Sequence, residues 1–276
     1  MRAIARDGRT WSSAGGRQAP PAAALRSEAN SLAATTSVLG HFHEISLETA
    51  DIRASVEFYE QLGFCHATTT DTWPHPYGVL TDGRLFLGLH QRRFASPTVT
   101  FVQPGVARLV PEFETRGIPL SVCHIEPEVF NEIGFRDPFG QPISVLEVRT
   151  YSPIALSPAK MSLCGYFDEF SMPVTNLETA KEFWEQLGFV ATDESDTPYL
   201  HLPLTSDYLN IAFHRPRTLD RPMLVFTDPD MPTRIGRLRE LGIALSDELP
   251  RGLDVRENAL IESPEGTQLL LLKSED

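Results

Sequence analysis

Residues 44–64 read EISLETADIRASVEFYEQLGF, and residues 169–189 read EFSMPVTNLETAKEFWEQLGF. The two stretches are offset by 125 residues and both end in EQLGF. Weaker matches follow at a similar offset. RLFLGLH, which ends at His90, corresponds to YLNIAFH, which ends at His214, and RDPFGQPI corresponds to ESPEGTQL. A repeat of this length is too long for a solenoid unit, so it predicts two copies of one whole domain.

Each copy begins with a short strand and then a helix. Asp51 is a good helix N-cap, and apolar residues follow it at spacings of three and four until Gly63. Asn176 and Gly188 bound the equivalent helix of the second copy. Short β-type segments come next, at 64–69, 77–81 and 85–90 in the first copy and at 189–192, 199–204 and 209–214 in the second. The predicted unit is therefore strand–helix–strand–strand–strand, or βαβββ.

A second unit of this kind is predicted in each copy, which makes four in all. The first copy has a strand at 98–102, a helix at 106–116 and strands flanking the turn at 137–140. The second copy has a strand at 223–226, a helix at 233–241 and strands flanking the turn at 263–266. The predicted domains are 41–149 and 164–273, joined by a linker at 150–163 that contains Ser and Pro without periodicity.

Residues 1–37 differ from the rest of the chain. They are rich in Arg, Ala, Ser, Gly and Pro, with few acidic residues and no apolar face. This composition predicts a disordered leader, with a transit peptide as the alternative.

The overall composition limits the class of partner. The chain has 276 residues, 41% of them hydrophobic, and a formal charge of −13. This charge argues against nucleic acid and anionic membrane surfaces as partners, although it leaves room for a small anion held by local arginines. The three cysteines show no CxxC spacing, which is typical of free thiols in the cytoplasm. We expect a cytoplasmic monomer or homodimer with a small-molecule ligand.

Four βαβββ units in one chain resemble the vicinal oxygen chelate superfamily, which includes glyoxalase I, bleomycin-resistance proteins, fosfomycin-resistance enzymes and extradiol ring-cleavage dioxygenases. The resemblance rests on the strand–Asp–helix opening at 44–64 and 169–189, and on the closing FRDPFGQPISVLE at 135–147. It implies an α+β fold of tandem βαβββ modules. These modules would form two glyoxalase-like domains, whose curled mixed sheets each enclose a cleft for a small molecule.

The resemblance also implies a divalent metal in the cleft, held by at least three His or Glu side chains. The implied positions are Glu44, Thr98 and Ser144 in the first domain and Glu169, Met223 and Leu270 in the second. Only the two glutamates are suitable ligands for Fe(II), Mn(II), Ni(II) or Zn(II). We therefore expect no metal centre of the usual three-ligand pattern, so that a divalent metal is possible but disfavoured.

A shared polar site is the other candidate. Strand alternation places a Glu and a Ser on the face opposite the apolar residues, and a His ends a later strand of each copy. The candidates for catalysis or for a weak metal site are Glu44, His90, Glu169 and His214. The residues expected to line the clefts beside them are Ser46, Tyr77, Arg84, Thr98, Ser144, Ser171, Tyr199, His201 and Met223.

These residues allow two interpretations. In the functional interpretation, each set of Glu, Ser and His is a general base with polar partners or the remnant of a metal site. In the structural interpretation, it is a buried, hydrogen-bonded Glu–Ser pair beside a surface His. The first function that we consider is a small-molecule-binding protein of the glyoxalase, bleomycin-resistance or dioxygenase type with a degenerate metal site. The alternative is a divergent metal-dependent lyase, isomerase or dioxygenase of the same superfamily. Because the usual metal ligands are missing at four of the six implied positions, the sequence favours the small-molecule-binding protein.

Overall fold

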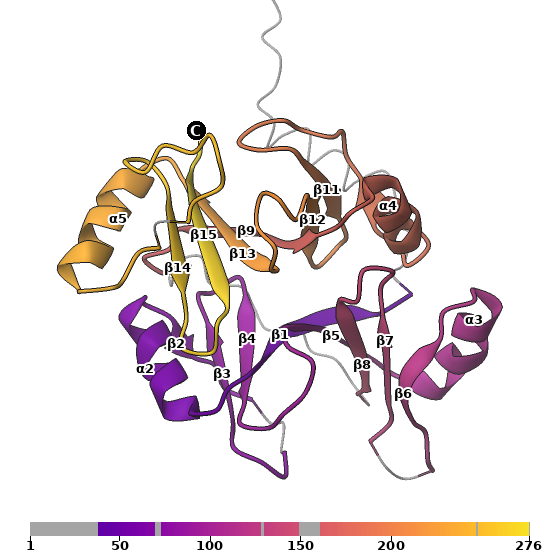
Figure 1. The fold of residues 1–276 in the computed structure, drawn as a ribbon. Coiled ribbons are helices and arrows are strands. Elements are labelled where there is room, and N and C mark those ends of the chain that lie inside the picture. Colours follow the sequence, from indigo (N-terminus) through magenta and orange to yellow (C-terminus); the bar gives the residue numbers. More distant parts are fainter. Residues whose placement is uncertain (1–37, 70–72, 128–129, 149–160, 247, 276) are drawn as a thin grey trace, which may run out of the picture. The chain divides into compact units, whose positions relative to one another are not determined.

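The structure is a computed structural model that describes residues 38–69, 73–127, 130–148, 161–246 and 248–275 (Figure 1). The predicted leader at 1–37 and most of the predicted linker lie outside the described residues. No helix of the described ranges is both long enough and apolar enough to cross a bilayer.

The first half forms an eight-stranded mixed sheet in the order β2-β3-β4-β1-β5-β8-β7-β6. Its strands are β1 (His41–Glu48), β2 (Cys65–His66), β3 (Tyr77–Thr81), β4 (Phe86–His90), β5 (Thr98–Gln103), β6 (Leu120–His124), β7 (Glu132–Arg136) and β8 (Pro142–Glu147). Its helices are α2 (Ile52–Gln61), the 3-10 turn η1 (Val106–Arg108) and α3 (Leu109–Thr115). The two predicted units meet where β1 pairs antiparallel with β5.

The second half forms a seven-stranded mixed sheet in the order β10-β11-β12-β9-β13-β15-β14. Its strands are β9 (Tyr166–Pro173), β10 (Val190–Ala191), β11 (His201–Thr205), β12 (Asn210–His214), β13 (Met223–Asp228), β14 (Ala259–Glu262) and β15 (Gln268–Lys273). Its helices are α4 (Leu177–Glu185) and α5 (Met231–Glu240). The predicted α+β class with two mixed sheets is confirmed. The fourth unit departs from the pattern, because an isolated bridge between Ser246 and Leu260 replaces its first return strand.

The first helix of each half begins where the sequence predicts. The Asp51 side chain accepts hydrogen bonds from the backbone N–H groups of Arg53 and Ala54, and Asn176 caps α4 in the same way. Gly63 follows α2 with a φ of 90°, a left-handed conformation that glycine adopts without strain. Local sequence therefore decides where the first strand of each half gives way to its helix.

The predicted helix at 106–116 is wrong in its first turn. The structure has η1 there, followed by the short helix α3. Pro111 explains the difference, since proline has no N–H to donate to the carbonyl group four residues earlier. The same residue is acceptable in the first turn of α3, where that N–H would lack a helical partner.

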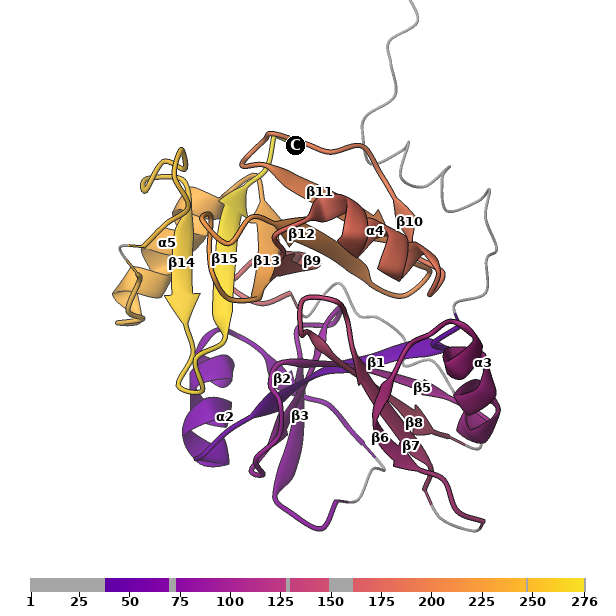
Figure 2. The same cartoon turned by 45° about the vertical axis from the view of Figure 1, so that its right-hand side comes forward.

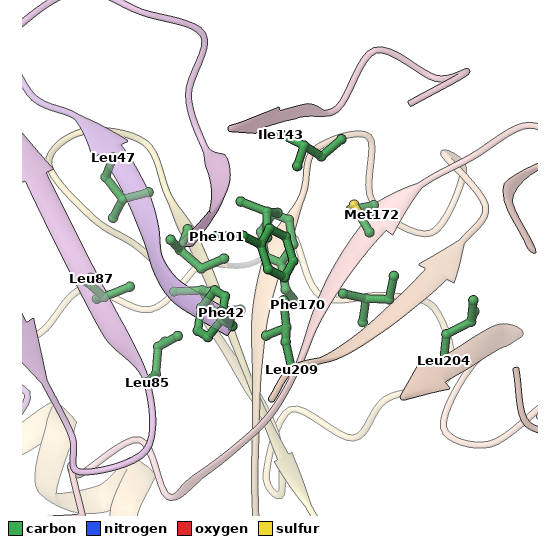
Figure 3. Packing of buried hydrophobic residues seen from close by; sticks show 14 of the residues in the cluster. Phe42, Leu47, Leu85, Leu87, Phe101, Ile143, Phe170, Met172, Leu204 and Leu209 are labelled. Atoms are coloured by element: carbon green, nitrogen blue, oxygen red, sulfur yellow. The ribbon is translucent and has the colours of Figure 1, made fainter. Parts of the chain in front are cut away.

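The two halves share an apolar core. Figure 3 shows Phe42 and Phe101 of the first half and Phe170 and Leu209 of the second half among the side chains of this cluster. The contacts between the halves are reciprocal.

The polar contacts between the halves join the first helix of one half to a turn of the other. Tyr59 of α2 donates to Glu265 in the β14–β15 turn (2.5 Å), while Trp184 of α4 donates to Asp137 in the β7–β8 turn (3.4 Å). Figure 2 shows α2 beside the β14–β15 turn. Each half therefore stabilises the other through equivalent elements.

Candidate functional site

A buried carboxylate lies at the centre of the first sheet. Glu44 on β1 is only 2% exposed. Its Oε1 accepts from Ser46 Oγ (2.7 Å) and lies 3.1 Å from His90 Nε2, and its Oε2 accepts from Tyr77 OH (2.7 Å). The structure thus brings these four sequence-predicted residues together around one anion. Three donors satisfy a charge that would otherwise be costly to bury.

A glycine on the neighbouring strand makes room for this carboxylate. Gly88 on β4 pairs with Ser46 on β1. A Cβ atom at Gly88 would overlap the carboxylate group of Glu44. The equivalent residue of the second sheet, which pairs with Ser171, is Ala212. The space occupied by the Glu44 carboxylate therefore depends on a glycine that the second sheet lacks.

The surroundings keep Glu44 ionised. Burial acts to raise its pKa, but the hydrogen bond with His90, the electrostatic attraction of His43 and His90, and the hydrogen bond from Tyr77 outweigh burial, so that the pKa is lowered. Glu44 therefore carries a negative charge at neutral pH and acts as an acceptor.

Two imidazole rings extend this network. His90 Nδ1 lies 2.9 Å from His75 Nε2, while the other nitrogen of His90 faces Glu44. Burial, followed by the charges of His90 and Arg92, lowers the pKa of His75. The result is a continuous carboxylate–imidazole–imidazole chain, an arrangement that can relay a proton.

A cavity of about 340 Å³ opens beside this network. Its hydroxyl groups come from Ser46, Thr98, Thr100, Ser121 and Ser144, its aromatic groups include Trp73 and Phe94, and its charged groups are Arg92, Glu132 and Arg136. His90 also contributes to the lining. This volume is in the range of pockets that hold small organic molecules.

One row of residues crosses the first sheet through this cavity. Glu44 on β1 pairs with Thr100 on β5, and Thr100 pairs with Ser144 on β8. Ser144 in turn pairs with Gly134 on β7. The residue in line with Glu44 is therefore Thr100. Thr98, which the residue spacing indicated, pairs with Ser46 instead, because strand register decides which side chains are opposite.

The same row of the second sheet is apolar. Glu169 pairs with Val225, Val225 with Leu270, and Leu270 with Leu260. These three apolar residues belong to a separate buried cluster that also contains Tyr199, Leu219, Met223 and Leu272. Leu270 and Leu260 therefore occupy the positions that Ser144 and Gly134 leave open in the first sheet. Met223, which was expected to line a cleft, is part of this apolar cluster.

His214 has neutral partners. Ser171 Oγ lies 2.8 Å from its Nδ1, and the carbonyl oxygen of Leu219 lies 3.0 Å from its Nε2. Burial lowers the pKa of His214 to about 4, against the opposing effect of its hydrogen bond with the Leu219 carbonyl group. His214 is therefore neutral at pH 7. Burial and the nearby charge of Glu169 raise the pKa of Tyr199, which keeps that hydroxyl protonated.

Two more residues were expected in the clefts, Arg84 and His201. The guanidinium group of Arg84 lies over the ring of Tyr166, 5.0 Å from its centre, because Arg84 follows a turn that faces the second half. His201 Nδ1 lies 2.8 Å from the carbonyl oxygen of Tyr199. The sequence analysis missed Thr100 and Gly88. Thr100 could have been found because it lies two residues after Thr98, on the same face of the strand. Gly88 could have been found because it aligns with Ala212 when the two repeats are compared.

The donors around Glu44 do not fit the metal centre that the fold implies. Within the described ranges, no group of three His, Cys, Asp or Glu side chains has an arrangement that could hold a metal ion. Thr100 and Ser144 offer only hydroxyl groups, and Ser144 donates to Glu132 (3.1 Å). Hydroxyl groups cannot replace imidazole and carboxylate as ligands for these divalent ions.

Comparison with solved structures shows which known proteins have a similar fold. No family model and no curated protein sequence matches the chain. A catechol 2,3-dioxygenase structure matches with a TM-score of 0.55 and 14% identity, over 86% of this chain and 88% of that chain. Homoprotocatechuate 2,3-dioxygenase from Arthrobacter globiformis matches with a TM-score of 0.59 and 14% identity, over 88% and 82%. BphC, a halotolerant catechol dioxygenase, matches with a TM-score of 0.52 and 13% identity, over 86% and 87%.

Proposed function

We propose that this chain is a small-molecule-binding protein whose ligand occupies the cavity of the first sheet. Its fold, that of the vicinal oxygen chelate superfamily with extradiol dioxygenases as structural neighbours, supports this proposal. The observation that carries the proposal is the contrast between the two equivalent rows. Thr100, Ser144 and Gly134 leave an open, hydroxyl-lined space, while Val225, Leu270 and Leu260 fill the same place in the second sheet.

The contrast is informative because the two halves share one fold. A stable core needs only packed apolar side chains on this face, as the second half demonstrates. Open space lined with polar groups contributes less to stability than a packed face does. A polar cavity on the sheet face that the second half fills with apolar side chains therefore points to a ligand. We also place the protein in the cytoplasm, since Cys65, Cys123 and Cys164 form no disulfide bond.

The alternative function is a divergent lyase, isomerase or dioxygenase. The Glu44–His90–His75 chain favours it, because a buried carboxylate that orients an imidazole is a common arrangement for general base catalysis. Metal analysis of the protein purified without an affinity tag separates the two functions. One Fe, Mn, Ni or Zn ion per chain would favour the metal-dependent enzyme.

A change at Ser144 tests the binding function. Ser144→Leu introduces the residue found at the equivalent position 270 and should fill the cavity, so that aromatic probes such as 2-naphthoate and 2-naphthamide lose at least tenfold in affinity. Ser144→Ala is the matched control, because it removes the hydroxyl group without filling the space. Fluorescence of Trp73 in the cavity and calorimetry provide the measurement. Equal binding by both variants would count against a ligand in this cavity.

A further inference from the structure

The geometry points to an organic anion as the ligand: a carboxylate held by Arg92 and Arg136, on a planar body that packs against Trp73 and Phe94. This inference rests on the proposed function and adds a ligand class to it. All four side chains line the cavity of the first sheet. A guanidinium group offers paired N–H donors that match the two oxygens of a carboxylate.

The two arginines are free to bind an anion. Among the described residues, neither Arg92 nor Arg136 forms an ion pair with a carboxylate, and Arg136 donates from Nη1 to the carbonyl oxygen of Gly140 (2.6 Å). The chain as a whole has a formal charge of −13. Two arginines without a carboxylate partner therefore give this cavity a local positive charge, although the protein as a whole is acidic.

The acidic residue of the cavity does not cancel these cations. Glu132 accepts from Ser144 (3.1 Å) and lies 3.8 Å from His124 Nδ1. Glu132 and Arg136 begin and end strand β7, four residues apart. Four residues of strand span roughly 13 Å, so the carboxylate lies at the other end of the cavity wall from the guanidinium group.

The second half provides an internal comparison. The residue equivalent to Arg136 is Glu262, which likewise ends its strand next to the turn. Glu262 is paired with Arg221 at 2.7 Å. The half whose equivalent row is apolar thus has a paired anion at this position, where the first half has a cation with no carboxylate partner among the described residues. Because the equivalent position of the same fold has a residue of opposite charge, the fold itself does not require an arginine at position 136.

An aromatic wall completes the proposed site. The ring centres of Trp73 and Phe94 lie 5.2 Å and 5.5 Å from that of His90, both at steep angles to it. Both side chains are half-buried, so each offers apolar surface to the cavity. A planar aromatic body buries this surface and finds favourable edge or stacked contacts there.

Two matched sets of probes test the inference. Benzoate, benzamide and benzamidine have nearly the same shape and differ in charge, and the corresponding 2-naphthyl compounds extend the body. We expect the carboxylates to bind to the full-length protein at least tenfold more tightly than the amides, and the amidines to bind least. Arg92→Gln and Arg136→Gln should each weaken carboxylate binding about tenfold and leave amide binding unchanged. Arg93→Gln, at an exposed neighbouring position outside the cavity, is the control.

The outcomes separate this inference from the function on which it rests. Amides that bind as tightly as carboxylates, carboxylate binding that survives both arginine changes, or the absence of carboxylate binding would overturn the anionic ligand. If amides bind and Ser144→Leu abolishes their binding, the cavity binds ligands and only the charge assignment is wrong. If Ser144→Leu leaves the binding of every probe unchanged, the proposed cavity itself is wrong.

Discussion

Two histidines at equivalent strand ends, His90 and His214, differ in the charge of their partners. His90 faces the carboxylate of Glu44, whereas His214 faces a hydroxyl group and a backbone carbonyl oxygen. Burial among neutral partners keeps the His214 imidazole neutral, whereas a nitrogen of His90 lies next to a charged carboxylate. The same residue in the same fold can therefore take part in proton chemistry in one half and act as a structural hydrogen-bonding group in the other.

The buried, neutral state of His214 predicts a pH dependence of stability. Its folded-state pKa is about 4, against 6.5 for an unperturbed histidine. Between these values the unfolded state binds more protons, so stability should fall as the pH falls from 6.5 to 4, by about 3 kcal/mol in total. Urea unfolding at a series of pH values measures this loss. His214→Gln, which has no charge to gain, should show a flatter profile in this window, and an unchanged slope would contradict the assignment.

At the scale of elements, the strand pair β1 and β4 differs from its counterpart β9 and β12 at the glycine beside the carboxylate. Gly88 lets the Glu44 carboxylate lie over β4, and Ala212 occupies the equivalent position of β12. A single methyl group thus decides whether this surface of the strand is open to a carboxylate. A Cβ atom at Gly88 would overlap Glu44 Oε1, so the close approach of the carboxylate to β4 requires a glycine there.

The close approach makes Gly88→Ala a sharp test of the network. The new methyl group should displace the Glu44 carboxylate, break its bonds to Ser46 and His90, and lower the free energy of unfolding by about 1–3 kcal/mol. Gly78→Ala on β3 is the control, since its Cβ would meet only Ile52 Cδ1 at an ordinary 3.9 Å. Urea unfolding measures both. If the two variants are equally stable, the carboxylate does not occupy the position described.

The elements also define how far the sequence can predict this protein. The helix caps Asp51 and Asn176, and the alternation that places Glu44 with Ser46, depend on neighbours in the chain and were predicted from them. The opposition of Thr100 to Glu44 depends on strand register, which residue spacing does not determine. The filled second face depends on Leu219 from a loop far along the chain from Glu169. Local patterns therefore gave the modules, while the difference between their faces needed the assembled sheet.

At the scale of the whole chain, the two halves depend on each other. Residues of both sheets enter one apolar core, and Tyr59 and Trp184 each contact a turn of the opposite half. Because the halves share buried surface, the half whose row is apolar still stabilises the half whose row lines the proposed site. The duplication is thus preserved in structure although its two faces have diverged in chemistry.

The filled row of the second sheet has a consequence for binding stoichiometry. A duplicated chain with two equivalent clefts would take up two ligands, and its titration could show cooperativity between them. Because Val225, Leu270 and Leu260 close one face, titration of this protein with 2-naphthoate should saturate at one molecule per chain along a simple hyperbola. Isothermal calorimetry measures that ratio directly, and a value near two would mean that the leucine-filled half opens in solution.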